Sequence, residues 1–334
     1  MRLSILDQSI ACEGKPQSEA IRESLELAEY CDGAGFYRYW VSEHHNSDGI
    51  VGTAPEILMA AIAARTSQIR IGSAGVMLPH YAALKVAEQF RVLEALAPGR
   101  IDMGLGRAPG SDRSTAMALN PNAGVAHERF PQQVVELMHW VSGTPFPDDH
   151  RYAKINAHPK GPTSPEVWML GSSDYGAQLG AELGLPYAFA YFFTDGAGAE
   201  QALHLYRHLY KPSERHPKAH PTMCVWALIA DSEEEAWHQF RSREHWKVRM
   251  ERGFREPLQS PDELIDVEYS TAELARMNQL RKSALVGTAD QVGKKMEQLM
   301  DTFKLEELVV VTWTFEANAR MRSCEHLANI MGLK

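Results

Sequence analysis

The sequence predicts an α/β protein whose eight parallel strands close into a TIM-type (β/α)8 barrel, a single domain over residues 1–334 with lid-like insertions. Short β-rich apolar runs alternate with amphipathic helical patterns over nearly the whole chain, which indicates parallel strands covered by helices. Eight such runs favour a closed barrel over an open sheet, and barrels of this kind routinely exceed about 250 residues. The sequence contains no internal repeat, low-complexity tract or linker that would divide the chain.

The predicted elements follow from the periodicity of the apolar residues. The eight predicted strands are Leu3–Leu6, Arg38–Ser42, Ile69–Leu78, Arg100–Gly106, Val167–Leu170, Tyr187–Phe192, Thr222–Ala230 and Leu308–Thr312. A helix is predicted over Ser18–Ala34, where apolar residues recur on one face. Two connections exceed the minimal repeat, residues 108–126 and 253–283. Because long connections in compact domains are often functional, both are predicted to act as lids.

Composition restricts the classes of partner. A chain that is 44% hydrophobic and 23% charged supplies the core of a soluble globular protein. The net charge of −9 argues against a nucleic-acid or anionic-membrane partner, so a phosphate ligand would need local donors. No apolar run approaches membrane-spanning length, and the N-terminus turns polar too soon for a signal peptide. Four dispersed cysteines without a CxxC pair favour a reduced cytoplasmic protein with no structural metal.

The active sites of such barrels lie where the strands end, and the second predicted strand ends in the polar residues 42–46. Alternation of side chains along a strand places His44 opposite Glu43 and His45, which argues against one metal bound by all three. A histidine at this place suits proton transfer near neutral pH. A hydrogen-bonded structural histidine explains His44 equally well.

Three further strand ends carry small or basic residues, and each has two interpretations. The small residues of 72–75 could admit a flat ligand or simply pack the barrel. Arg107 follows a glycine-rich turn and could clamp a phosphate or lie solvated; a dinucleotide fingerprint fails because Pro109 replaces its third glycine. Ser172 and Ser173 precede a helix that begins near Tyr175, where they could cradle an anion or serve as an ordinary cap.

Taken in this order, residues 42–46, 72–79, 98–112 and 170–173 resemble the bacterial luciferase family of flavin-dependent oxidoreductases, closest to its YhbW-like branch. The resemblance covers essentially the full chain. It implies that His44 is catalytic and that Ala74-Gly75 is a non-prolyl cis peptide against the flavin ring. The residues that it implies for cofactor binding are Ser73, Ala74, Gly75, Arg107, Arg129, Gly171, Ser172 and Ser173.

Two departures limit what the resemblance implies. A reactive cysteine of luciferase is Gly106 in this chain, so the chemistry of that thiol does not transfer. Residues 253–283 show no match to the mobile lid of luciferase, which shapes the substrate cavity. A long-chain aldehyde substrate and light emission are therefore not expected.

The resemblance implies a monooxygenase that uses reduced FMN and O₂, with oxygen adding at the flavin C4a position and one atom passing to an unidentified small organic substrate. A separate flavin reductase and a homodimer are implied in the same way. Three alternatives remain open: a non-catalytic flavin-binding protein, an F420-dependent reductase or dehydrogenase, and a hydrolase using Glu43 and Asp102. The position of Asp102 near the start of its strand disfavours the hydrolase.

Overall fold

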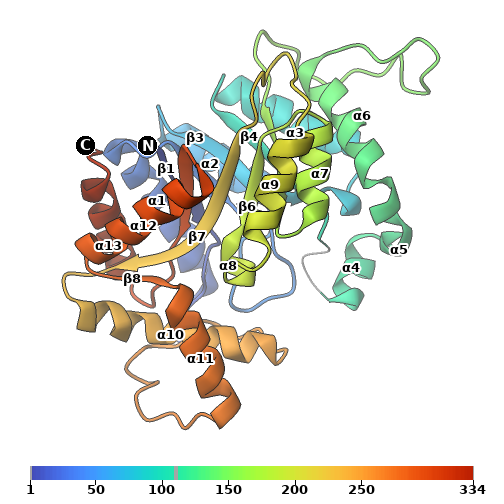
Figure 1. Ribbon diagram of the computed structural model, residues 1–334. Coiled ribbons are helices and arrows are strands. Elements are labelled where there is room, and N and C mark those ends of the chain that lie inside the picture. Colours follow the sequence, from blue (N-terminus) through green and yellow to red (C-terminus); the bar gives the residue numbers. More distant parts are fainter. Residues whose placement is uncertain (1, 109–111, 334) are drawn as a thin grey trace.

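The computed structural model describes residues 2–108 and 112–333. Its centre is a closed barrel of parallel strands in the order β1-β2-β3-β4-β5-β6-β7-β9, in which β9 returns to pair with β1. Helices surround this barrel on its outer face, and the two ends of the chain lie near each other (Figure 1). The predicted TIM-type (β/α)8 barrel is confirmed.

The strands are β1 Arg2–Asp7, β2 Arg38–Val41, β3 Arg70–Met77, β4 Ile101–Gly106, β5 Glu166–Gly171, β6 Tyr187–Ala190, β7 Pro221–Ile229, β8 Leu285–Gly287 and β9 Glu307–Val311. The α-helices are α1 Gln17–Ala34, α2 Pro55–Arg65, α3 Ala83–Leu96, α4 Arg113–Leu119, α5 Ala123–Ala126, α6 Phe130–Ser142, α7 Asp174–Glu182, α8 Tyr191–Thr194, α9 Ala199–Leu209, α10 Glu233–Glu251, α11 Thr271–Ser283, α12 Ala289–Phe303 and α13 Ala317–Ile330. Two short 3₁₀ turns are η1 Leu78–His80 and η2 His127–Arg129.

All eight predicted barrel strands are present, with ends within two residues of the prediction. The strand predicted to reach Phe192 ends at Ala190, because residues 191–194 turn into α8, which Asp195 closes in the left-handed conformation at φ 51°. The three-residue β8 was not predicted. It pairs with the last residues of β7, Ala227–Ile229, and with no other strand of the described chain.

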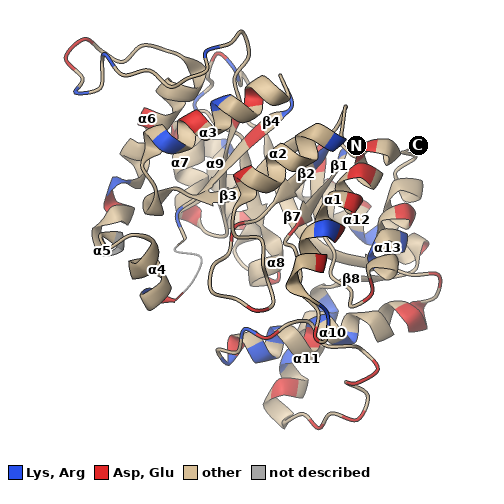
Figure 2. Ribbon diagram, turned by 180° about the vertical axis from the view of Figure 1, so that it is seen from behind, with Lys and Arg blue, Asp and Glu red and all other residues tan. Residues whose placement is uncertain are grey.

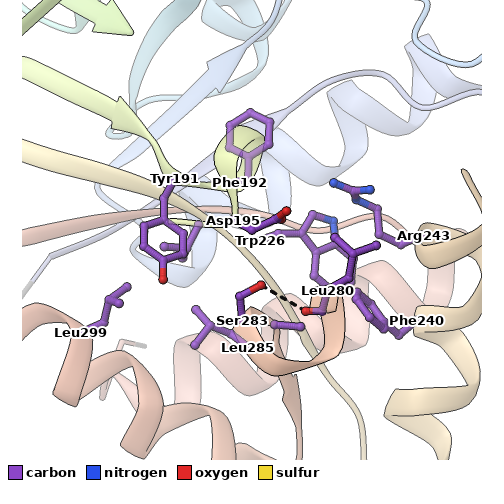
Figure 3. Close-up of a pocket in the computed structure, with 12 residues that line it drawn as sticks. Tyr191, Phe192, Asp195, Trp226, Phe240, Arg243, Leu280, Ser283, Leu285 and Leu299 are labelled. Carbon is purple, nitrogen blue, oxygen red and sulfur yellow. Dashed lines mark hydrogen bonds between the residues drawn. The ribbon is translucent and has the colours of Figure 1, made fainter. Parts of the chain in front are cut away.

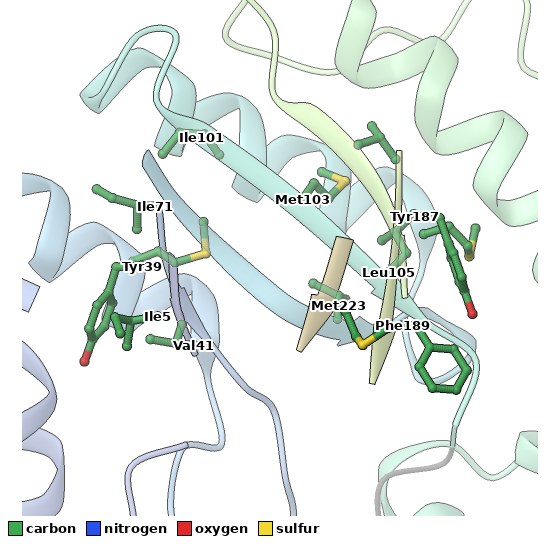
Figure 4. Packing of buried hydrophobic residues seen from close by; sticks show 14 of the residues in the cluster. Ile5, Tyr39, Val41, Ile71, Ile101, Met103, Leu105, Tyr187, Phe189 and Met223 are labelled. Carbon is green, nitrogen blue, oxygen red and sulfur yellow. The ribbon is translucent and has the colours of Figure 1, made fainter. Parts of the chain in front are cut away.

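Strict alternation along the strands separates two apolar clusters. On β2, Tyr39 and Val41 face the helices, whereas Trp40 between them faces the barrel interior. On β7, Met223 likewise faces outward and Cys224 inward. Figure 4 shows the outward set between strands and helices. This two-residue period, which a parallel barrel requires, is the signal that made the strands predictable.

The end of the barrel at which the strands begin is filled by buried charges. Arg38 on β2 donates to Asp102 on β4 at 2.7 Å, to Glu166 on β5 at 2.8 Å and to Glu307 on β9 at 3.0 Å. Burial opposes ionisation of Glu166, but Arg38 and Arg70 lower its pKa to about 2. Because Asp102 is fully buried in this network, at the end opposite the strand ends, it is unavailable as the second carboxylate of a hydrolase.

The opposite end of the barrel carries four helices that are additions to the minimal repeat. There α10 and α11 lie on one side and α4 and α5 on the other (Figure 1). Acidic and basic residues are interspersed on α10 to α13 (Figure 2). Within the described ranges, no helix has both the length and the apolar character of a membrane span. The two long connections that were predicted to be lids therefore both lie beside the strand ends.

Candidate functional site

A cavity of about 610 Å³ lies where the barrel strands end. Its volume falls in the range of about 300–1,000 Å³ that small-molecule sites occupy. The side chains and turns that follow β2, β3, β4 and β5 all contribute to its wall. Seven of the nine residues predicted for the site line it: His44, Ala74, Gly75, Arg107, Gly171, Ser172 and Ser173. We call it the main cavity.

His44 follows β2 and reaches the wall of the main cavity through a short polar turn. Its backbone N–H donates to the carbonyl of Gly52 at 3.0 Å, and its ring Nδ1 lies 3.2 Å from the hydroxyl oxygen of Ser42. Burial lowers the pKa of His44 to about 4, so the imidazole is neutral at pH 7. The ring is thus a candidate proton acceptor or neutral hydrogen-bond donor, whereas the sequence suggested titration near neutral pH.

Glu43 and His45 lie together, as strand alternation predicted, and their hydrogen bonds stabilise the local structure. The Glu43 carboxylate accepts a hydrogen bond from the backbone N–H of Met77 at 3.0 Å and another from the hydroxyl of Tyr81. His45 Nε2 lies 2.9 Å from the same carboxylate. In the part of the chain that the structure describes, no group of three or more His, Cys, Asp or Glu side chains is placed to hold a metal ion.

Arg107 and the start of α7 form a polar corner of the main cavity. The guanidinium carbon of Arg107 lies 3.7 Å from the ring centroid of Tyr175, in the first turn of α7. Ser173 is the N-cap of this helix but makes no side-chain capping bond, so the cap interpretation is wrong in its ordinary form. The free N–H groups of the helix start, two hydroxyls and one guanidinium therefore converge from β4 and β5, as an oxyanion ligand requires.

The small residues of β3 have two roles. The Ala74–Gly75 peptide bond is cis, as the family resemblance implied, and both residues line the main cavity. A Cβ atom on Gly75 would lie 2.6 Å from Cδ1 of Leu170 and 2.7 Å from the carbonyl oxygen of Gly104. The packing interpretation is thus correct for the missing side chain of Gly75, while its backbone presents a flat surface to the cavity.

Two of the residues predicted for cofactor binding lie elsewhere. Ser73 is fully buried, and its hydroxyl donates to the Gly104 carbonyl at 3.0 Å and accepts from the Gly104 N–H at 3.1 Å. Its side chain joins β3 to β4 because strand alternation turns it outward from the cavity. Arg129 lies exposed in η2, outside the residues that line the main cavity. Pro109, whose place excluded a dinucleotide fingerprint, lies outside the described residues together with Gly110 and Ser111.

The comparisons with known proteins are consistent over the whole chain. Residues 1–303 match the model of the family described as luciferase-like monooxygenase. The chain belongs to the luciferase-like monooxygenase family. A luciferase-like monooxygenase of Escherichia coli strain K12 is 39% identical over 322 residues, which is 96% of this chain and 94% of that protein. An N-acetyl-S-alkylcysteine monooxygenase of Bacillus subtilis strain 168 is 36% identical over 315 residues, 93% of this chain and 92% of its own length.

Solved structures share the fold of the chain. Apo-MsnO8 has a TM-score of 0.88 and 32% identity, covering 100% of this chain and 99% of its own. The oxygenating constituent of a Pseudomonas putida 3,6-diketocamphane monooxygenase, solved with FMN, has a TM-score of 0.71 at 17% identity over 98% of this chain and 96% of its own. An F420-dependent secondary alcohol dehydrogenase has a TM-score of 0.65 at 15% identity, over 98% of this chain and 98% of its own. At these lower identities the likeness is one of fold, so these two structures show that proteins with this fold bind FMN in one case and F420 in another.

Tyr175, Gln8 and Cys224 are among the residues of this luciferase-like cavity that sequence reasoning missed. The sequence marks Tyr175 only as a helix start, although the guanidinium of Arg107 lies over its ring. Gln8 follows β1, is 2% exposed, and its Oε1 finds no donor among the described residues. Cys224 on β7 also lines the cavity, and burial raises the pKa of its thiol well above the usual value. The thiol is therefore neutral, and it does not replace the reactive cysteine of luciferase, whose position Gly106 occupies in this chain.

Proposed function

We propose that this single-domain protein is an FMN-dependent monooxygenase that takes reduced FMN and O₂ and oxygenates a small organic substrate. The observation that carries the proposal is the convergence of Arg107, Tyr175 and the uncapped start of α7 on the main cavity. The cis peptide at Ala74–Gly75 and the neutral imidazole of His44 line the same cavity. This arrangement supplies donors for a phosphate, a flat wall for a ring and one proton-transfer group.

The residues present fit FMN on chemical grounds. The N–H groups at the start of α7, the hydroxyls of Ser172 and Ser173 and the Arg107 guanidinium would bind the phosphate. The buried Gln8 Oε1 is an acceptor without a donor, which suits an N–H of a bound ring. When bound, reduced FMN supplies the two electrons that activate O₂.

Each protein group then has a separate task. The wall formed by Ala74 and Gly75 would fix the plane of the ring, and the neutral Nε2 of His44 would accept or return a proton beside it. The apolar residues Leu170 and Phe192 would exclude water from the reacting atoms. Because the sequence carries no dinucleotide-binding fingerprint, we propose that a separate reductase delivers the reduced flavin.

We further propose a cytoplasmic homodimer. All four cysteines are free and buried, which suits a reducing compartment. Exposed apolar side chains on the neighbouring helices α2 and α3, Ile57 at 67%, Val92 at 49% and Leu96 at 59%, supply apolar surface for a second copy. Sedimentation velocity should then show one species of twice the mass of the chain; a monomer at micromolar concentration would contradict the dimer.

The catalytic proposal is tested with photoreduced FMN, isotopically labelled dioxygen and a panel of ketones, terpenes, thioethers and N-acetyl-S-alkylcysteines. We expect one product that carries one labelled oxygen atom and requires both protein and FMN. Tight FMN binding with no oxygenation across the panel would instead indicate a flavin-binding protein without turnover. Oxidation or reduction of a substrate with F420 alone would indicate the deazaflavin alternative.

A further inference from the structure

A second cavity lies beside the main cavity, between α8, β7, α10 and the end of α11 (Figure 3). It measures about 40 Å³, which is enough for a small polar group but not for a whole organic molecule. Phe192 lines both cavities, so the two meet at its side chain. We call the second cavity the annex.

Arg243 on α10 is the charged residue that most needs explaining in the annex. It is 5% exposed and lines the annex, where Figure 3 shows its guanidinium beside the indole of Trp226. Its guanidinium carbon lies 4.8 Å from the ring centroid of Trp313 and 6.0 Å from that of Trp226. Among the described residues, no acceptor lies within hydrogen-bond distance of its Nε or Nη1.

Three further buried donors near Arg243 lack acceptors among the described residues. The indole N–H groups of Trp226 and Trp313 have no hydrogen-bond partner within the described chain, and neither has Nη1 of Arg276. Buried polar groups are nearly always hydrogen-bonded, and each donor left without an acceptor costs free energy. Of these residues Arg243 and Trp226 line the annex. Unpaired donors at the wall of a small cavity are the complement of an acceptor-only group, which is an anion.

The charges around the annex are also unbalanced. Arg276 donates to Asp195 at 2.6 Å and to Glu251 at 2.7 Å, and Lys247 lies 3.6 Å from Glu251. The three cations Arg243, Arg276 and Lys247 thus face the two carboxylates Asp195 and Glu251, which leaves one positive charge in excess. Burial lowers the pKa of Arg243 to about 10, so the guanidinium is still charged at neutral pH.

We propose that Arg243 anchors the carboxylate of the substrate, which is an apolar carboxylic acid with its anionic end in the annex and its body in the main cavity. The volume of the annex admits a carboxylate, and the aromatic wall at Phe192 suits an aromatic or aliphatic body. A carboxylate would accept from the unpaired donors and neutralise the excess charge. The inference rests on the proposed function, since it names the substrate class of that site.

The test measures equilibrium binding by calorimetry with no flavin and no oxygen present. The probes are phenylacetate, its uncharged analogue phenylacetamide, and acetate. We expect phenylacetate to bind at least about tenfold more tightly than phenylacetamide, because only the acid satisfies the guanidinium. Equal binding of acid and amide would overturn the proposal. Acetate binding as tightly as phenylacetate would also overturn it, because the annex would then be a site for free anions.

Variants of α10 separate the anchor from a structural role. Arg243→Met removes the guanidinium but keeps an unbranched apolar side chain, and it should weaken phenylacetate binding by about tenfold or more while leaving phenylacetamide unchanged. Arg249→Met is the matched control on the same helix, since Arg249 is paired with Glu256 and should not affect either probe. Unchanged phenylacetate binding in Arg243→Met would refute the anchor. If Arg243→Met does not fold, two measurements replace it. One is phenylacetate binding by Arg243→Lys, which keeps the charge, and the other is the comparison of phenylacetate with phenylacetamide on the unmodified protein.

The outcome is independent of the flavin. Because the titration contains neither FMN nor O₂, a failure of the proposed oxygenation leaves the binding result intact. Conversely, the protein could oxygenate neutral compounds and bind phenylacetate and phenylacetamide equally. That result would support the proposed function and refute the role of Arg243 as a carboxylate anchor. A drop in the intrinsic tryptophan fluorescence on adding phenylacetate gives a second readout, because Trp226 and Trp313 surround the guanidinium.

Discussion

Replacing Arg107 with Ala should weaken FMN binding through the phosphate alone. A charge-assisted contact to a phosphate contributes about 1.5–3 kcal/mol. Arg107 is exposed, so screening by solvent and salt places the effect at the lower end, about 1.5 kcal/mol or roughly tenfold in Kd. Removing the platform by Tyr175→Ala should give a smaller loss of about threefold, because stacking at an exposed site contributes about 0.5–1 kcal/mol.

The assay is titration of flavin fluorescence with the protein, performed with FMN and, as the matched control, with riboflavin, which lacks the phosphate. Arg107→Ala should weaken FMN and leave riboflavin within a factor of about two, and the FMN affinity should fall with added salt in the unmodified protein only. An equal loss for both flavins would show that Arg107 supports the fold of the corner. No loss for either would remove Arg107 from the site.

Three further changes follow from the structure. His44→Ala should leave the Kd for FMN within a few-fold and slow turnover by about 10² to 10⁴, measured as labelled product formed per enzyme; normal turnover would exclude His44 from the chemistry. The pKa of His44 is about 4 in the folded protein and 6.5 in its ordinary state, so between these pH values the unfolded state binds more protons. The free energy of unfolding therefore falls as the pH is lowered from 6.5 to 4. His44→Ala lacks this group, so its urea melts should show a smaller loss of stability over the same pH range. Arg38→Leu leaves Glu307 buried without its arginine and should cost about 3–5 kcal/mol in urea unfolding; an unchanged midpoint would contradict the ion network. Gly75→Val places a Cβ against the Gly104 carbonyl and should lower Tm and soluble yield, whereas a native melt would show that β3 and β4 can separate.

The fold was predictable because its signal is local. Alternation on β2 and β7 marks each strand independently of the others, and eight strands with helices between them leave few architectures. The limit appears at Tyr187–Phe192, where the apolar run continues although the strand ends at Ala190 and α8 begins. Nothing in the local pattern distinguishes a buried strand from a buried turn, since both need apolar side chains.

The site was predictable only in part, for the same reason. Arg107 and the serines before α7 stand at strand ends, so their place in a barrel follows from the order of the strands. The roles of Gln8 and Arg243 depend on a missing hydrogen-bond partner, which is a property of the folded surroundings and of no sequence pattern. Arg129 lies in the turn η2 and does not line the main cavity, although His127 in the same turn does; the sequence does not specify which side chains of such a turn face a cavity.

The most direct measurement of the central claim is a crystal structure of the protein grown with FMN. The account predicts the phosphate at the start of α7 beside Arg107 and the ring against Ala74–Gly75, with the imidazole of His44 near the ring and away from the phosphate. FMN bound with its phosphate elsewhere, or a main cavity that stays free of FMN at saturating concentration and is filled by F420 instead, would contradict it.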